Sequence, residues 1–351
     1  MSLQIGMLAP ITHPYPPDGY GPWERVTYDL VESLVAAGHD VTLFAAEDSR
    51  TAARLHATTP APLTRRPDTD ARAVEDEHIR NALVACSVLG VDVLHSHLHV
   101  HVLERADLWD GPIVSTLHGV AWDPAVRRRL DPHAHRPFVS LSDSERRFHP
   151  GLNWVATVPN GIATEELPPG PGGGGYVAFV GRLAPEKAPH LAIEAARRAG
   201  VPIVLAGIIE EKHRRYADRV LEMTDGDQAR YLGPLDRPDL VPLLQNAEAL
   251  LMPLEWDEPF GLVVVESLAC GTPVVAWRRG AMSEIVEEGR TGYLVDDVES
   301  AGEALARITS ISRDLCAHEA RRRFDRTVMA AAYAEVYRNV SSSLTGPRRA
   351  G

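Results

Sequence analysis

The stretch Glu255-Trp256-Asp257-Glu258-Pro259-Phe260-Gly261-Leu262-Val263-Val264-Val265-Glu266-Ser267 organises the second half of the chain. It follows an apolar run, 249–253, that is typical of a buried parallel strand. Pro259 and Gly261 predict a turn, and a helical pattern runs from Leu262 to Cys270. Glu258 would then lie in the loop beyond the strand, and Glu266 more than one turn into the helix. Helix starts donate free N–H groups and carry roughly half a positive charge, so they suit a phosphate. Together these features indicate a nucleotide-sugar site.

The chain before this stretch alternates short apolar strands with amphipathic helices. Such alternation predicts an α/β fold with a doubly wound parallel sheet and right-handed crossovers. The predicted strands are Leu3–Pro10, Asp40–Ala46, Val91–His97, Pro112–His118, Pro137–Ser142 and Trp154–Val158, and the main predicted helices are Pro22–Ala37 and Ala71–Leu89.

Residues 167–175 read Leu-Pro-Pro-Gly-Pro-Gly-Gly-Gly-Gly, a composition that excludes a helix or a central strand. We interpret this segment as an interdomain linker, stiffened by proline at first and flexible afterwards. The alternative is a surface loop within one large sheet.

The strand–helix alternation restarts after this segment, which predicts a second Rossmann-like, doubly wound domain. The predicted strands are Tyr176–Val180, Pro202–Ala206, Ala229–Leu232, Ala249–Met252, Pro273–Trp277 and Gly292–Val295, and the predicted helices are Pro189–Ala199, Lys212–Met223, Arg237–Ala247, Leu262–Cys270, Ser283–Glu287, Ser300–Ile308 and Ser312–Arg323. We therefore expect two α/β domains, 1–166 and 176–325, facing each other across a cleft, followed by one more amphipathic helix over 326–343.

Composition narrows the class of protein. The 351 residues carry a formal net charge of −12, which argues against nucleic-acid binding and against a polybasic membrane contact. The three cysteines, Cys86, Cys270 and Cys316, lie far apart and predict core thiols in a reducing cytoplasm. No signal peptide and no stretch of membrane-spanning length is evident. A homo-oligomer is compatible with this sequence.

Several groups in the first half follow predicted strands, where α/β sheets bind ligands. Gly19 and Gly21 allow a sharp turn before the helix that starts at Pro22, and a phosphate could sit there. His118 ends a strand and precedes Gly119; a satisfied core histidine is the alternative. A histidine-rich run, His95 to His101, places His95 and His97 on one strand face, but lacks the carboxylate or cysteine ligands of a compact metal site.

Two cations follow the first strand of the second half. Arg182 can grip phosphate oxygens with two parallel N–H bonds, and Lys187 adds a point charge. A solvated surface pair is the alternative. The arginines 127–129 have no interleaved aromatic residues and are more typical of a solvated helix face than of a nucleic-acid site.

These motifs resemble glycosyltransferase family 4. The resemblance rests on Gly181-Arg182-x4-Lys187, on Glu258-Pro259-Phe260-Gly261-x4-Glu266 and on Gly271-Thr272-Pro273 in the second half, and on Gly19, Gly21 and His118-Gly119 in the first. It implies a retaining enzyme of the GT-B fold that depends on a nucleotide sugar. Residues 1–166 would bind the acceptor, 176–325 would bind the donor, and the helix at 326–343 would return to the N-terminal domain.

The resemblance also implies roles for residues. Glu266 would bind the donor's ribose, Glu258 the donor sugar, and Arg182 with Lys187 the diphosphate, whose departure they assist. Backbone N–H groups of Phe260, Gly261, Leu262 and Val263 would hold phosphate and sugar oxygens. Gly19 and Gly21 would approach the distal phosphate, and His118 the reactive side of the sugar. The expected catalytic set is Glu258, His118, Arg182 and Lys187, with no metal and no other cofactor.

The chain departs from the family pattern at two places. Pro22 removes one N–H from the phosphate cradle beside Gly21, and the run Arg278-Arg279-Gly280 leaves the role of Gly280 open. The first half also has no strongly basic membrane-docking face, which favours a soluble acceptor or a glycan.

The predicted reaction transfers a hexose from a UDP- or GDP-linked donor to an acceptor hydroxyl. We favour front-face attack, in which a phosphate oxygen takes the acceptor's proton and binding and electrostatics dominate. The alternatives are a nucleotide-sugar-binding protein without transferase activity, and an epimerase or phosphorylase on the same scaffold.

Overall fold

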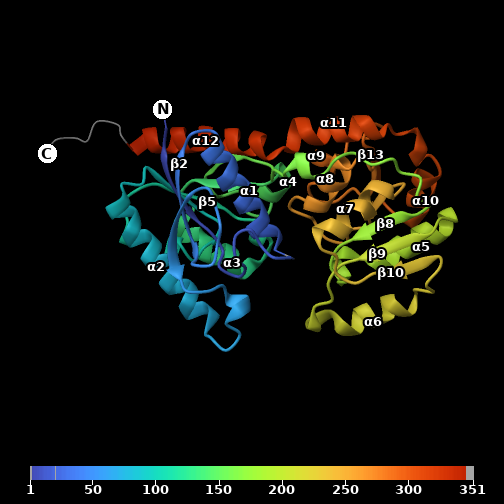
Figure 1. The fold of residues 1–351 in the computed structure, drawn as a ribbon, viewed down its shortest axis with the longest axis horizontal. Coiled ribbons are helices and arrows are strands. Elements are labelled where there is room, and N and C mark those ends of the chain that lie inside the picture. Colours follow the sequence, from blue (N-terminus) through green and yellow to red (C-terminus); the bar gives the residue numbers. More distant parts are fainter. Residues whose placement is uncertain (1, 20, 345–351) are drawn as a thin grey trace. The chain divides into compact units, whose positions relative to one another are not determined.

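The computed structural model of the protein describes residues 2–19 and 21–344. The chain divides into two compact units. Unit 1 comprises residues 1–161 together with 326–351, and unit 2 comprises residues 162–325. The two predicted parallel-sheet α/β domains are therefore confirmed (Figure 1).

The described part of unit 1 forms a seven-stranded parallel sheet in the order β3-β2-β1-β4-β5-β6-β7. Its strands are β1 (Gln4–Leu8), β2 (Asp40–Ala46), β3 (Arg54–Thr59), β4 (Val93–Ser96), β5 (Ile113–Thr116), β6 (Phe138–Ser140) and β7 (Trp154–Thr157). Its helices are α1 (Pro22–Ala36), α2 (Ala71–Leu89), α3 (Pro124–Leu130), α4 (Asp143–Arg146) and α12 (Arg326–Leu344).

The edge strand β3 was not predicted. Its sequence, Arg-Leu-His-Ala-Thr-Thr, is polar and mostly half-buried or exposed, so it lacks the apolar run that marked the other strands. The remaining strands are largely buried, and the core of unit 1 packs α2 residues such as Ile79 and Leu83 against Leu8 and Leu94 of the sheet.

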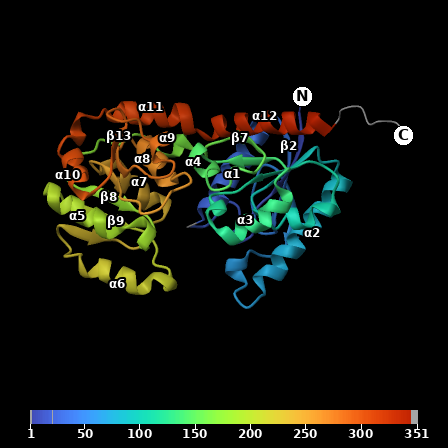
Figure 2. The ribbon, with the colours of Figure 1, turned by 180° about the vertical axis from the view of Figure 1, so that it is seen from behind.

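Helix α12 belongs to unit 1, as the family resemblance implies for residues 326–343. It packs against α1 and β4, and Figures 1 and 2 both show it alongside α1. Arg326 at its start lies 3.7 Å from the buried carboxylate of Asp29 in α1. Farther along, the buried side chains of Tyr333 and Tyr337 reach the central strands.

Unit 2, all of whose residues are described, forms a six-stranded parallel sheet in the order β10-β9-β8-β11-β12-β13. Its strands are β8 (Val177–Val180), β9 (Ile203–Ala206), β10 (Ala229–Tyr231), β11 (Leu250–Met252), β12 (Val274–Trp277) and β13 (Gly292–Val295). Its helices are α5 (Pro189–Ala199), α6 (Arg214–Glu222), α7 (Arg237–Asn246), α8 (Leu262–Ala269), α9 (Met282–Ile285), α10 (Val298–Ala306) and α11 (Arg313–Phe324).

The Pro/Gly-rich segment 167–175 lies inside unit 2 and does not connect the two units. Gly170 N–H donates to the Cys270 carbonyl at 2.9 Å, and Gly172 N–H donates to the Gln245 carbonyl at 3.0 Å. The guanidinium of Arg313 holds the same segment through the Gly170 carbonyl and also reaches the Gln245 and Ala247 carbonyls. Glycine here permits close packing, because a Cβ at Gly170 would lie 2.6 Å from the Gln245 Cα atom.

The chain instead passes between the units at Gly161–Ile162 and Asp325–Arg326. The unit 2 residues at these points are joined, since Ile162 N–H donates to the Phe324 carbonyl at 2.8 Å. The Thr164 hydroxyl also donates to the Asp325 carboxylate. The first junction thus lies five residues before the predicted boundary at 166.

Candidate active site

The loop between β11 and α8 carries the acidic motif in unit 2. Helix α8 starts at Leu262, as predicted, and Gly261 precedes it with φ +101°, a conformation that favours glycine. Leu262 and Val263 form its half-exposed first turn. The ring of Phe260 is buried against Phe324 at a centroid distance of 5.8 Å, so this residue offers a ligand its backbone and not its side chain.

Glu258 lies in the same loop, and its side chain is almost fully buried. One carboxylate oxygen accepts from Lys187 Nζ and from Trp256 Nε1, the latter at 3.1 Å. Lys187 Nζ also lies 5.0 Å from the centre of the Trp256 ring, within reach of a cation–π interaction. The structure therefore brings Glu258 and Lys187 together, and adds Trp256, which the sequence did not single out. The signal in the sequence that could have identified it is its position, two residues before Glu258.

Gly280 determines how this loop sits. It adopts φ +56°, and a Cβ there would lie 2.2 Å from the Glu258 carbonyl oxygen and 2.3 Å from its backbone nitrogen. Gly280 N–H donates to the Asp257 carboxylate at 3.0 Å, and Ala281 N–H donates to the Glu258 carbonyl at 2.8 Å. The role of Gly280 that the sequence left open is thus a close approach of two loops.

Arg182 follows β8 and is paired with two carboxylates. Its guanidinium lies 2.7 Å from Glu210 and 3.0 Å from Glu186. Burial tends to raise the pKa of Glu210, but the hydrogen bond and charge of Arg182, with Lys212, outweigh it and lower that pKa. Neither carboxylate was recognised in the sequence.

Glu266 lies on α8 and is directed at the start of α7. Its carboxylate is 3.4 Å from Arg237, whose guanidinium is 3.0 Å from Glu166. A ligand hydroxyl that binds Glu266 would therefore share this carboxylate with Arg237.

Gly19 and Gly21 lie in the loop after β1 in unit 1, and Tyr20 between them lies outside the described residues. Gly21 caps the start of α1 with an extended backbone. Its lack of a side chain matters for packing, because a Cβ would lie 2.9 Å from the Pro17 Cβ atom. Gly19 is exposed.

His118 follows β5 and is buried, with φ +49°, and Gly119 follows with φ +86°. Its Nε2 atom is 2.7 Å from His97 Nδ1, and its ring is stacked on that of Trp23 at 5.8 Å. Burial, followed by the charges of His97 and His99, moves the pKa of His118 well below its ordinary value. The imidazole is therefore neutral at physiological pH and suits hydrogen bonding.

The histidine-rich run has hydrogen-bond partners of its own. His95 and His97 share a face, as predicted, with ring centroids 4.2 Å apart. His95 contacts the Tyr337 hydroxyl at 2.7 Å and the Thr116 hydroxyl at 2.8 Å. Within residues 2–19 and 21–344, no group of three His, Cys, Asp or Glu side chains is placed to hold a metal ion.

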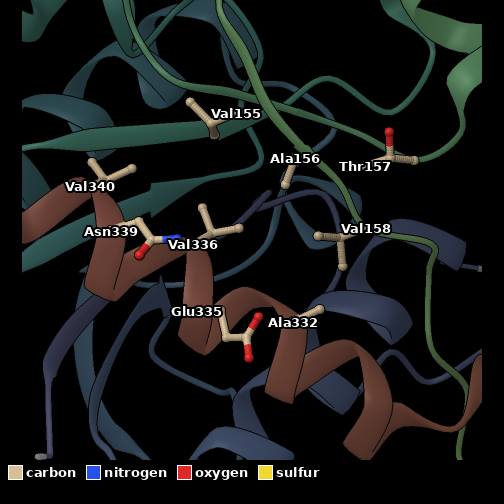
Figure 3. Close-up of a pocket in the computed structure, with 9 residues that line it drawn as sticks. All are labelled: Val155, Ala156, Thr157, Val158, Ala332, Glu335, Val336, Asn339 and Val340. Carbon is tan, nitrogen blue, oxygen red and sulfur yellow. The ribbon is translucent and has the colours of Figure 1, made fainter.

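A separate cavity of about 390 Å³ lies in unit 1 between β7 and α12 (Figure 3). Figure 3 shows apolar side chains such as Val155 and Val336 around it, with one carboxylate, Glu335. None of the predicted site residues lines it.

Comparison with known proteins identifies relatives of both halves. The family described as "Glycosyltransferase Family 4" matches residues 23–166, and that described as "Glycosyl transferases group 1" matches residues 168–328. Glycogen synthase of Mycobacterium tuberculosis is 30% identical over 394 aligned residues, covering 92% of each protein.

Solved structures share the whole fold. Sucrose-phosphate synthase from Thermosynechococcus elongatus is similar with a TM-score of 0.80 at 20% identity, covering 97% of this chain and 100% of that one. The Anabaena protein Alr3699/HepE, in complex with UDP-glucose, has a TM-score of 0.73 at 17% identity, covering 96% and 100%. In the part of the chain that the structure describes, no helix is both long and apolar enough to span a membrane.

Proposed function

Because the chain belongs to glycosyltransferase family 4, we propose that it transfers a hexose from a nucleoside diphosphate sugar to an acceptor hydroxyl with retention at the anomeric carbon. The observation that carries the proposal is the contact of Glu258 with Lys187 and Trp256 directly before α8. In this contact a cation from the segment after β8 meets a buried carboxylate in the loop between β11 and α8, close to the start of that helix. The UDP-glucose complex of the Anabaena protein supports a UDP-linked donor, and a GDP-linked donor is the alternative.

The Lys187–Glu258 contact suggests how the donor is engaged. A diphosphate oxygen that binds Lys187 competes with Glu258 for the ammonium group. The carboxylate then becomes available to accept from hydroxyls of the donor sugar, while Trp256 Nε1 still fixes its orientation. Binding of the phosphates and binding of the sugar are coupled in this way.

The remaining donor contacts follow from the same arrangement. Arg182 neutralises the charge that develops on the diphosphate. To do so, its guanidinium gives up its contacts with Glu186 and Glu210. The N–H groups of Gly261, Leu262 and Val263, with that of Phe260, bind phosphate and sugar oxygens. Glu266 accepts from the ribose hydroxyls. In unit 1, we assign Gly19 and Gly21 to the distal phosphate and neutral His118 to the donor sugar.

No side chain is required as a strong base in this proposal. The acceptor hydroxyl attacks beside the departing diphosphate, and a phosphate oxygen takes its proton. Arg182, Lys187 and the α8 start supply the positive field that a metal supplies elsewhere, so we expect turnover to persist in a chelator such as EDTA. Loss of activity in EDTA, restored by Mg²⁺ or Mn²⁺, would contradict this part of the proposal.

The acceptor is proposed to be a small molecule or a glycan, the latter supported by the similarity to glycogen synthase. The buried thiols of Cys86, Cys270 and Cys316 fit a reducing cytoplasm.

Screening nucleotide sugars for thermal stabilisation tests the donor. A ligand at 100 times its dissociation constant should stabilise the protein by about 2.7 kcal/mol. Release of sugar from the stabilising donor then distinguishes an enzyme from a protein that only binds, and NMR of the product's anomeric proton reports retention.

Replacement of Glu258 tests the site. Glu258→Gln should lower turnover by about 100-fold, because the amide cannot replace the charge beside the sugar. Nucleoside diphosphate affinity should not fall, because the carboxylate no longer competes with the phosphates for Lys187. Glu299→Gln, which removes a carboxylate paired with Arg198 on the surface of the same unit, is the matched control and should leave turnover unchanged. Equal turnover in both variants would remove Glu258 from the site.

A further inference from the structure

The turn that carries His118 is held by a buried carboxylate from another element. Gly119 N–H donates to Glu145 Oε1 at 2.5 Å, and Leu141 N–H donates to Glu145 Oε2 at 2.7 Å. Glu145 lies on α4, and its side chain is fully buried. One carboxylate thus joins the residue after His118 to the residue after β6.

Local helix capping explains only part of this arrangement. Ser142 caps α4 by accepting from Glu145 N–H at 3.2 Å, as in a capping box. In a capping box, the glutamate side chain would turn back to the N–H of Ser142. Here it bonds instead to Gly119, 26 residues away, so it serves the turn after β5 as well as its own helix.

The turn needs such support because its backbone is strained. His118 is one of three described residues other than glycine with positive φ, and Gly119 continues in the left-handed region. A left-handed conformation costs a non-glycine residue about 1–2 kcal/mol. The backbone at residue 118 decides where the imidazole points, and the bond to Glu145 fixes the peptide that follows it.

We propose that Glu145 is a positioning residue for His118, which keeps the imidazole in the orientation needed to act on the donor sugar. This inference rests on the proposed function for the activity of His118, but the Glu145–Gly119 contact can be tested without it. A carboxylate is needed because two N–H groups converge on it. A glutamine presents one acceptor oxygen and would face the second N–H with its own NH₂ group.

Protonation of Glu145 should have a similar effect, because a carboxylic acid loses one good acceptor. Burial raises its pKa to about 7, against the two N–H bonds that lower it. Outside α4, the charge of Glu145 acts on Tyr333 of α12. Burial raises the pKa of Tyr333, and the Glu145 charge raises it further. The other charged residues of α4 are Asp143 and Arg146, and the titratable residue of the turn is His118.

The test compares Glu145→Gln with Asp143→Asn, which removes a carboxylate from the same helix without touching the turn. In protein labelled at histidine, the ring signals of His118, assigned with His118→Gln, should shift in Glu145→Gln and stay in place in Asp143→Asn. In the unmutated protein they should also move as the pH falls through about 7. Unmoved signals in both experiments overturn the inference, whatever the activity.

With the donor found by screening, Glu145→Gln should lower kcat by up to about 100-fold, the cost of misplacing a catalytic group by about 1 Å. Nucleoside diphosphate affinity should not change. In the unmutated protein kcat should fall as the pH drops below 7 and Glu145 is protonated, and this fall should be absent from Glu145→Gln. A kcat and pH profile equal to those of Asp143→Asn would refute the inference. If the unmutated protein turns over no donor sugar, the proposed function fails, and the His118 signals still decide the positioning role.

Discussion

Unit 1 encloses several histidines whose pKa values are lowered by burial, and this predicts a measurable uptake of protons on unfolding near pH 6. His78, His95, His97 and His118 are buried. Burial lowers the pKa of His78 to about 4 and that of His95 to about 3, and moves those of His97 and His118 well below the ordinary value. His78 also donates from Nε2 to the Ala9 carbonyl at 2.9 Å, which fits a neutral ring.

The magnitude follows from linkage. An unfolded histidine with a pKa of 6.5 binds about 0.75 proton at pH 6, whereas folded His78 binds almost none. His78 and His95 together therefore contribute about 1.5 protons, and His97 and His118 act in the same direction. Glu145 acts in the opposite direction, because its raised pKa makes the folded state bind about 0.9 proton more than the unfolded state at pH 6. The net uptake from His78, His95 and Glu145 is about 0.6 proton, and His97 and His118 add to it.

Stability must therefore fall as the pH drops. His78 and His95 each cost about 1.4 kcal/mol between pH 7.5 and 5.5, and Glu145 returns about 1.8 kcal/mol, so these three groups make unfolding easier by about 1 kcal/mol. His97 and His118 act in the same direction as the other two histidines. The histidine contribution is fully present above pH 6.5 and is lost towards the folded pKa values of about 3 to 4.

Calorimetric unfolding at pH 6 in two buffers with different ionisation enthalpies measures the uptake directly. His78→Gln should reduce it by about 0.75 proton. His135→Gln is the control, because His135 is exposed and its surroundings change little on unfolding. A difference between His78→Gln and the unmutated protein below about 0.2 proton would refute the reasoning, since it would mean that His78 titrates alike in both states.

Three substitutions in unit 2 test other parts of the structure. Gly280→Ala should lower donor turnover by about 100-fold, because the added Cβ collides with the backbone of Glu258 and displaces the loop. The control is Gly289→Ala, at φ +70° with open space around it, which should retain turnover. Equal turnover in the two variants would contradict the close approach of the two loops. Arg313→Met should lower the free energy of unfolding by about 3 kcal/mol in urea titrations, because several backbone carbonyls lose their hydrogen-bond donor. A loss under 1 kcal/mol would show that these hydrogen bonds contribute little to stability. Arg182→Ala should weaken nucleoside diphosphate binding by at least ~1.5 kcal/mol in titration calorimetry, while Arg198→Ala, on an exposed ion pair, should not; matching affinities would count against Arg182.

The predictable part of this fold is the part whose strands are buried on both faces. Strand β12 is a continuous apolar run, and β2 is one from Leu43 to Ala46, so their presence and parallel arrangement followed from the sequence. The edge strand β3 has a polar sequence and was missed. Composition alone predicts a linker at 167–175, because the carbonyl and guanidinium groups that bind this segment come from α7, the end of α8 and α11.

The candidate site was predictable where one loop carries it. Glu258 and Lys187 follow neighbouring strands, and their contact agrees with a shared site. The sequence does not single out Trp256, and it leaves the role of Gly280 open. The importance of both residues depends on distances of a few ångströms to Glu258. Glu145 has a local signal, the Ser142-x-x-Glu145 capping pattern, but that pattern says nothing about its bond to Gly119.

The junctions at Gly161–Ile162 and Asp325–Arg326 give the protein an order of assembly. Unit 2 is one uninterrupted run of chain, whereas unit 1 is completed only by α12. The hydroxyls of Tyr337 and Tyr333 on that helix satisfy His95 and Thr116 in the middle of the first sheet. During synthesis from the N-terminus, the residues of the first sheet emerge early but lack these partners until the whole of unit 2 has left the ribosome. The half of the protein that is made first is therefore finished last, and a chain truncated before residue 326 would leave its central histidine and threonine without the tyrosines that satisfy them.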